Sequence, residues 1–252
     1  KFAKCQWYKL SNFGQHISTI YFLNDQSAPL TGFVGLGYFS TGVLPIGSKV
    51  WKTTDGGISW TLCNSSKFTL TGITNFSFKD SNIGWVSGGH LGVYPGYASC
   101  LRTTDCGNTW TPVLEGIENV EASSVYFHNP TNLLFVTAWA GGTKVSSDLG
   151  TTWSTISNKT NGVAFVNDND GIMTRVSDGG VVFYPTLRTI DGGLTWLQTN
   201  LLEETWQPLA IKGTQIFFCV GDLSNNIYRS NDGGVTWSII SNIQSNGHIA
   251  GT

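Results

Sequence analysis

Charged side chains are scarce in this 252-residue sequence, at 12% of the total, with 14 Lys or Arg and 16 Asp or Glu. Soluble domains usually carry about 25%. The few cations are scattered along the chain, which excludes the clustered basic surface that nucleic-acid binding requires. Apolar runs are short too, and none approaches the roughly 18 residues of a membrane span. We therefore expect neither a nucleic-acid partner nor a direct membrane span.

Strong helix formers are also in short supply, with one Met and few Glu, whereas the chain contains 31 Gly. Such a composition, rich also in Ser, Thr and Asn, disfavours long helices and favours β-structure. Ten Trp and fourteen Phe provide ample apolar surface for a core, so a disordered chain is excluded. A polar surface of low charge is typical of exported proteins, and a start at Lys1 is compatible with a processed mature chain and equally with a segment cut from a longer one.

Metal-ligand and nucleophile motifs are missing as well. The five Cys have no C-x-x-C spacing, which argues against a structural zinc site and a dense disulfide framework, but leaves one or two bridges open. The four His are isolated from one another, and neither H-E-x-x-H nor G-x-S-x-G occurs. The sequence therefore predicts no metal and no cofactor.

What the chain does contain is one motif written five times, D-x-G-x-[ST]-W. Its Asp residues lie 50, 43, 43 and 41 positions apart. A basic residue stands three positions before the Asp in four of the five copies, namely Lys52, Arg102, Arg188 and Arg229. The Asp and Trp of the copies, which we interpret as structural, are Asp55, Trp60, Asp105, Trp110, Asp148, Trp153, Asp191, Trp196, Asp232 and Trp237. Such even spacing indicates a repeat architecture.

Each copy has a physical interpretation as a turn between two strands. The Asp carboxylate accepts hydrogen bonds from turn N–H groups, the second Gly supplies a positive φ, and the Trp is an apolar wedge between sheets. Two strand-like runs precede each motif, as in 74–78 and 84–87. Four strands in about 44 residues match one blade of a β-propeller.

The motif resembles the Asp-box, or BNR repeat, of sialidase-type propellers. The fuller pattern, Ile83-Gly84-Trp85-Val86 followed by Arg102-Thr103-Thr104-Asp105, is similar to the branch that contains photosystem II assembly and stability factors. The resemblance implies an all-β propeller of four-stranded antiparallel blades. Its function stays open, because this scaffold serves enzymes, receptors and binding proteins alike.

We expect residues 1–252 to form a single propeller domain with five complete repeats. These span about 17–63, 72–114, 122–157, 161–200 and 207–242. Residues 1–16 and 243–252 are interpreted as partial strands that either close a five-bladed ring or continue into a larger ring of six or seven blades.

Outside the repeated motif, the chain contains a set of aromatic and acidic residues that the turns do not need. The long loops between second and third strands and the connections between blades should share one face, opposite the Asp turns, where loops on a rigid scaffold carry function. The ligand-binding candidates on that face are Tyr38, His90, Tyr94, Tyr97, Trp139, Arg175, Asp178, Tyr184, Glu203, Glu204 and Trp206. Asp25, Asp80 and Asp168 are interpreted instead as turn formers between first and second strands.

The residues outside the motif favour binding over catalysis. A sialidase-like site needs three Arg, and only Arg175 lies outside the repeat; a xyloglucanase-like site needs two opposed carboxylates, such as Asp178 or Asp222 with Glu203. We expect no catalytic residues, and an exported or cell-surface propeller that binds a glycan or a protein partner. The alternatives are a glycoside hydrolase, and a periplasmic or lumenal assembly factor for a photosynthetic membrane complex, for which the basic residues before each Asp would line a rim.

Overall fold

The computed structural model describes residues 12–13, 16–37, 48–63, 72–89, 97–118, 122–138, 142–157, 160–175, 184–221 and 226–242. These ranges contain twenty strands and no helix, which confirms the all-β prediction. Within them, accordingly, no helix has the length and apolar character to cross a membrane.

The strands form five antiparallel four-stranded sheets, in which each strand pairs with the next along the chain. The first blade contains β1 (Ile17–Phe22), β2 (Gly32–Leu36), β3 (Lys49–Thr53) and β4 (Thr61–Leu62); the second contains β5 (Gly72–Phe78), β6 (Gly84–Gly89), β7 (Tyr97–Thr103) and β8 (Thr111–Glu118). The third contains β9 (Ala122–His128), β10 (Leu133–Ala138), β11 (Thr143–Ser146) and β12 (Ser154–Ser157). The fourth contains β13 (Thr160–Phe165), β14 (Gly171–Arg175), β15 (Leu187–Thr189) and β16 (Leu197–Gln198), and the fifth β17 (Thr205–Ala210), β18 (Phe217–Gly221), β19 (Asn226–Ser230) and β20 (Ser238–Asn242).

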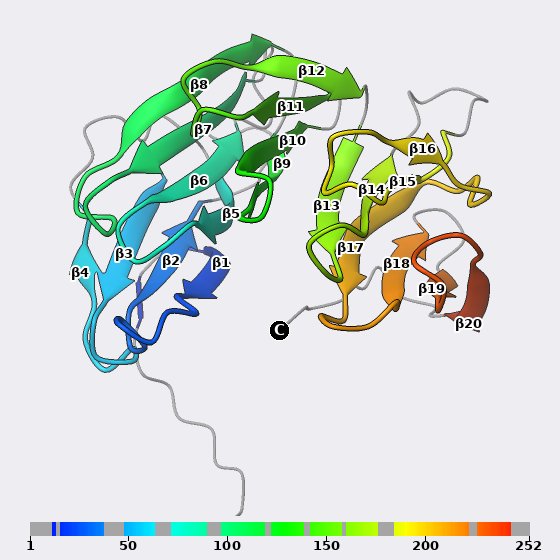
Figure 1. Ribbon diagram of the computed structural model, residues 1–252. Helices are drawn as coiled ribbons and strands as arrows, with labels where there is room; N and C mark the ends of the chain where they lie inside the picture. The colour runs from blue at the N-terminus through cyan, green and yellow to red at the C-terminus, as the bar shows by residue number, and fades with distance from the viewer. Residues whose placement is uncertain are drawn as a thin grey trace, which may run out of the picture.

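The blades fan around a common axis, with their first strands innermost (Figure 1). Contacts join β1 to β5, β5 to β9, β9 to β13 and β13 to β17. Within the described ranges, β17 and β1 are not packed together in this way. This is the blade arrangement of a β-propeller. Closure through residues 1–16 and 243–252 stays a prediction, because apart from residues 12, 13 and 16 these segments lie outside the described residues.

Hydrogen bonds explain every fixed position of the repeated motif, as the first copy illustrates. The Thr53 hydroxyl donates to Asp55 Oδ1 at 2.8 Å and accepts from the backbone N–H of Gly57 at 2.8 Å. Ser59 donates its backbone N–H and its hydroxyl to the two Asp55 oxygens, at 2.9 and 2.6 Å. Trp60 Nε1 donates to the Gly57 carbonyl at 2.9 Å. The same pattern recurs in the other four copies, so we call residues 55–60, 105–110, 148–153, 191–196 and 232–237 the box turns.

The box turns of the second to fifth blades also pack against the blade before them, and this is a second reason for their glycines. Gly193 has φ of 90°, and a Cβ built on it would lie 2.7 Å from Phe135 Cζ in the third blade. A Cβ built on Gly107 would lie even closer to Phe33 Cε1 of the first blade. Trp196 meets Phe135 edge to face at 6.1 Å. The box turns therefore bury their apolar side between blades, where aromatic pairs stabilise the packing.

The basic residues before the box turns connect each blade to the next. Lys52 Nζ donates to Asn108 Oδ1 at 3.0 Å, and Arg102 Nη1 donates to the Leu149 carbonyl at 3.1 Å; both acceptors lie in the following blade's box turn. Arg188 lies in the same way against Gly233 of the fifth blade. In the fifth blade itself, the Arg229 guanidinium lies 5.6 Å over the Phe218 ring. Three of these cations, Lys52, Arg102 and Arg188, therefore contact the next blade, whereas Arg229 packs within its own blade.

The turns between first and second strands use a side-chain oxygen as predicted, with one difference. Asp25 Oδ1 accepts from Ser27 N at 2.8 Å, and Asp80 Oδ1 accepts from Ile83 N at 2.7 Å. In the fourth blade Asn167, one residue before the expected Asp168, accepts from the backbone of Asp170 at 2.7 Å. An Asn side chain forms this turn as well as an Asp, because only an acceptor oxygen is needed.

Candidate functional site

The two ends of the propeller differ in what they present. Each box turn lies beside the turn between the first and second strands of its own blade, as the bonds from Gly56 N to Leu30 O and from Cys106 N to Asn82 O indicate. We call this end the box face. The loops between second and third strands and the connections between blades lie at the opposite end, the loop face, because antiparallel strands place alternate connections at opposite ends of a sheet.

Only part of the predicted loop-face site lies in the described ranges. Tyr38, His90, Tyr94, Trp139 and Asp178 lie outside them. Tyr97 is the first residue of β7. Arg175, Tyr184, Glu203, Glu204 and Trp206 all lie at or near the loop-face ends of strands in the fourth and fifth blades.

Arg175 and Tyr184 form a stacked pair at the loop-face edge of the fourth blade. Arg175 ends β14 and Tyr184 lies three residues before β15, so the two flank the same loop. The guanidinium carbon lies 4.5 Å from the centre of the tyrosine ring, within the range of a cation–π contact. Burial lowers the pKa of Arg175, while the neighbouring Tyr184 raises it. The pair therefore offers a cation and an aromatic ring held in a fixed relative position.

A buried hydrogen bond ties this pair to the acidic and aromatic residues of the fifth blade. The hydroxyl oxygens of Thr186 and Thr205 lie 3.2 Å apart, and both side chains are buried. Thr186 follows Tyr184 by two residues, and Thr205 stands between Glu204 and Trp206. This hydrogen bond joins the segment that follows Tyr184 to the segment of the fifth blade that contains Glu203, Glu204 and Trp206, and we call this place the junction between the fourth and fifth blades. That these residues form one site with Arg175 stays a prediction.

Sequence reasoning missed Asn161, in the innermost strand of the fourth blade. It is the extra residue of a β-bulge in β13, next to Thr160, which pairs in register with Arg175. Asn161 is 3% exposed, and its backbone oxygen accepts from the Thr137 hydroxyl at 3.0 Å. Its side-chain Nδ2 has no hydrogen-bond partner among the described residues. A buried amide donor without a partner costs free energy, and such a cost is common where a ligand binds.

The bulge is a general feature of the innermost strands, and it leaves a signal that can be found in the sequence. Every innermost strand changes register near its loop-face end. The residues at this position are polar in all five blades, namely Ser18, Thr74, Ser123, Asn161 and, in β17, Gln207 followed by Pro208. Bulges often re-aim side chains next to binding sites.

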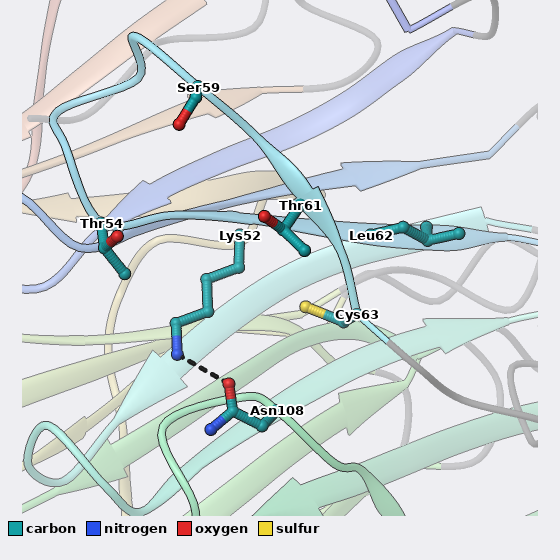
Figure 2. A pocket seen from close by; sticks show the side chains of 7 residues that line it. All are labelled: Lys52, Thr54, Ser59, Thr61, Leu62, Cys63 and Asn108. Carbon is teal, nitrogen blue, oxygen red and sulfur yellow. Dashed lines mark hydrogen bonds between the residues drawn. The ribbon is translucent and has the colours of Figure 1, made fainter.

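A separate pocket of about 300 Å³ lies between the outer strands of the first blade and the box turn of the second blade (Figure 2). It is lined by Lys52, Thr54, Ser59, Thr61, Leu62, Cys63 and Asn108. Figure 2 shows Lys52 directed at Asn108, its hydrogen-bond partner in the next blade. Burial raises the pKa of the Cys63 thiol to about 11, so the thiol is protonated at neutral pH and is a poor nucleophile. We interpret this pocket as part of the packing interface between the first and second blades.

The described residues contain few groups suited to metal or thiol chemistry. Among them, no cluster of three His, Cys, Asp or Glu side chains is placed to hold a metal ion. Four of the five cysteines, Cys63, Cys100, Cys106 and Cys219, are free thiols, and Cys5 lies outside the described ranges. Glu203 and Glu204 are the carboxylates of the junction, and they are adjacent in the chain.

Comparison with known proteins finds similarity in structure alone. No family model and no curated protein matches the sequence. A GH74 xyloglucanase from Xanthomonas campestris is similar over 96% of this chain, with 12% identity and a TM-score of 0.65. YCF48 bound to a D1 peptide matches over 90% of the chain, with 16% identity and a TM-score of 0.54. The arabinofuranosidase Arb93A from Fusarium graminearum also matches over 90%, with 14% identity and a TM-score of 0.52.

The chain spans 40% of the xyloglucanase, 67% of YCF48 and 81% of the arabinofuranosidase. At these identities the likeness concerns the fold, and it agrees with the four-stranded blades and the packing of their first strands. Fold alone does not decide among hydrolysis, assembly and binding. The chain has the β-propeller fold, and the structures similar to it include glycoside hydrolases and a protein solved with a bound peptide.

Proposed function

We propose that this protein is an exported, non-catalytic propeller that binds carbohydrate through its loop face, at the junction of the fourth and fifth blades. The observation that carries the proposal is the unpartnered Asn161 amide, which follows the strand partner of Arg175 in the chain, together with the stacking of Arg175 on Tyr184. Sugar-binding sites combine an aromatic surface with a few fixed polar groups.

The chemistry of the junction suits the hydroxyl groups of a sugar. Arg175 and the Asn161 amide are hydrogen-bond donors, whereas Glu203 and Glu204 are acceptors. Tyr184 adds an aromatic ring that stacks on Arg175, and Trp206 adds one from the neighbouring strand β17. A sugar ring has an apolar face and a polar edge, so it matches such a mixed surface.

The two alternative functions receive less support. Hydrolysis of a glycosidic bond requires two carboxyl groups on opposite sides of the bond, about 5–10 Å apart. Glu203 and Glu204 are neighbours in the chain, and the carboxylates considered as opposing partners, Asp178 and Asp222, lie outside the described ranges. Support for a basic rim of an assembly factor is also weak, because Lys52 and Arg102 bind the next blade.

A glycan array followed by calorimetry tests the proposal. The wild-type protein should bind at least one glycan, and Tyr184→Ala and Trp206→Ala should each weaken binding at least tenfold. Leu194→Ala is the matched control, since Leu194 is 67% exposed in the box turn of the same blade and should leave the affinity unchanged.

Three outcomes would overturn the proposal. Binding that survives both aromatic substitutions would place the site elsewhere. Binding to peptides but to no glycan would favour the protein-partner function. Hydrolysis of a bound glycan that is lost in Glu203→Gln or Glu204→Gln would make the protein an enzyme.

A further inference from the structure

A contact between distant blades marks the box face near the axis. Lys212 lies in the turn between β17 and β18 of the fifth blade, and its Nζ donates to the hydroxyl of Tyr126 at 3.3 Å. Tyr126 belongs to β9, the innermost strand of the third blade. The fourth blade stands between these two blades in the chain order, and its Val166 carbonyl accepts a hydrogen bond from Gly213 N, beside Lys212, at 2.8 Å. A side chain of the fifth blade can contact one of the third blade only where the ends of the innermost strands converge.

Tyr126 is held in a rigid stack. Its ring lies on Phe165 with centroids 5.5 Å apart, and His128 lies on the same phenylalanine at 4.0 Å. His128 is 3% exposed, and its Nδ1 lies 2.8 Å from the Thr131 hydroxyl. Burial lowers the pKa of His128, so the imidazole is uncharged at neutral pH. The stack therefore fixes the tyrosine without adding a competing charge.

The donors of the pair are only partly used. An ammonium group has three N–H donors, and a phenol that accepts a hydrogen bond still has its own O–H to donate. Among the described residues, the bond between Lys212 and Tyr126 is the one hydrogen bond that either of these groups makes. Two ammonium donors and one phenol donor thus remain for a ligand.

Neighbouring charges do not neutralise the site completely. Burial lowers the pKa of Lys212, and Asp168 on the adjacent turn of the fourth blade raises it. Burial raises the pKa of Tyr126 to about 12, and Tyr21 contributes in the same direction. The site therefore pairs the Lys212 ammonium group with a phenol that is protonated at neutral pH. In the described part of the chain, the exposed Asp168 does not form a direct ion pair with Lys212.

We propose that Lys212 and Tyr126 form a second binding site, on the box face, for the carboxylate group of a ligand. Two donor groups 3.3 Å apart, one of them charged, match the two oxygens of a carboxylate, and charge-assisted hydrogen bonds are the stronger kind. The carboxylate belongs to a uronic acid sugar or to an acidic amino acid. This site lies at the end of the propeller opposite the loop-face junction, so it stands independently of the proposed function.

Titration with three small probes tests the site, with binding followed by calorimetry or NMR. D-Glucuronate or L-glutamate should bind to the wild-type protein, whereas D-glucose, which lacks a carboxylate, should not. Stronger binding of glucuronate indicates a sugar acid as the natural ligand, and stronger binding of glutamate indicates an acidic peptide. Absence of binding by both carboxylates would overturn the proposal.

Two variants and two controls separate a binding role from a structural one. Lys212→Ala should reduce carboxylate affinity at least tenfold, and Tyr126→Phe, which keeps the stacked ring, should reduce it several-fold. Lys79→Ala removes a lysine 4.0 Å from Asp80 at the equivalent turn of the second blade and should leave affinity unchanged. Tyr184→Ala at the loop face should also have no effect. Unchanged affinity in Lys212→Ala would show that its contact with Tyr126 only joins the blades.

Discussion

At the scale of single residues, the repeated Asp is defined by its oxygens. Each carboxylate accepts from a hydroxyl two residues before it and from a backbone N–H and hydroxyl four residues after it, as Asp232 does from Ser230 and Thr236. Hydrogen bonds to the charged form of a carboxyl group lower its pKa. The hydroxyl positions in the motif are therefore as necessary as the Asp itself, which explains why Ser and Thr alternate there but no apolar residue occurs.

These hydrogen bonds predict a loss of stability in acid. Side-chain and backbone hydrogen bonds hold the pKa of Asp55 and of Asp232 at about 2, below the ordinary value of 3.8. Because the folded pKa is the lower one, the unfolded chain binds more protons below about pH 4, and stability falls as the pH drops from there toward 2. Urea unfolding at pH 5, 4, 3 and 2.5 should show a midpoint that declines in this window. A midpoint that stays constant down to pH 2.5 would contradict the assignment.

At this scale the sequence predicted the hydrogen-bonded positions of the box turns, whereas the loop-face binding residues stay a prediction. The Asp, Gly and Trp positions were readable because their roles depend on residues a few positions away. Asn161 was not readable, because its importance comes from a register change and from burial between blades. Lys212 and Tyr126 were missed for a similar reason, since 86 residues separate two side chains that meet near the axis.

At the scale of elements, the box turn connects two strands of its own blade and also packs against the neighbouring blade. Gly193 combines a φ of 90° with close approach to the Phe135 ring. Gly213 has a φ of 74°, but no neighbouring atom lies within 4 Å of the place that an alanine methyl group would take. The sequence indicated the positive φ of Gly193 but not the close approach, because the neighbour belongs to another blade. The two contributions can be separated by substituting both glycines.

Alanine at these two positions should therefore have unequal effects. Gly213→Ala should cost roughly 1 kcal/mol, the usual penalty for a side chain at positive φ. Gly193→Ala should cost about 2–4 kcal/mol, because overpacking against Phe135 adds to that penalty. Denaturant unfolding of both variants measures the difference. Equal losses would mean that the turn conformation alone accounts for the glycine.

At the scale of the whole molecule, the order of the blades could be predicted from the repeat. The proposed binding site on the box face could not be predicted from it. Motif spacing fixed how many strands lie between successive Asp residues, and the five sheets agree with it. From the sequence, ligand binding was expected on the loop face, and the assembly-factor alternative added only a rim formed by the basic residues before each box turn. A site on the box face could not be detected there, because the residues that form it come from the third and fifth blades and share no motif.

The joints between blades run in one direction along the chain, from a basic residue to the next box turn, as from Lys52 to Asn108 and from Arg102 to Leu149. Each blade then depends on its immediate neighbours, as in a one-dimensional array with nearest-neighbour coupling. Within the described ranges the first and fifth blades each have one such neighbour, and the third has two. We expect amide hydrogen exchange to be fastest in β1–β4 and β17–β20 and slowest in β9–β12. Uniform exchange across all five blades would contradict this expectation.

Local unfolding that begins at the first and fifth blades would affect both proposed binding sites. Trp206 and the turn that carries Lys212 belong to the fifth blade, at its two opposite ends. Loosening of this one blade would therefore release ligands from either face while the central blades stay folded.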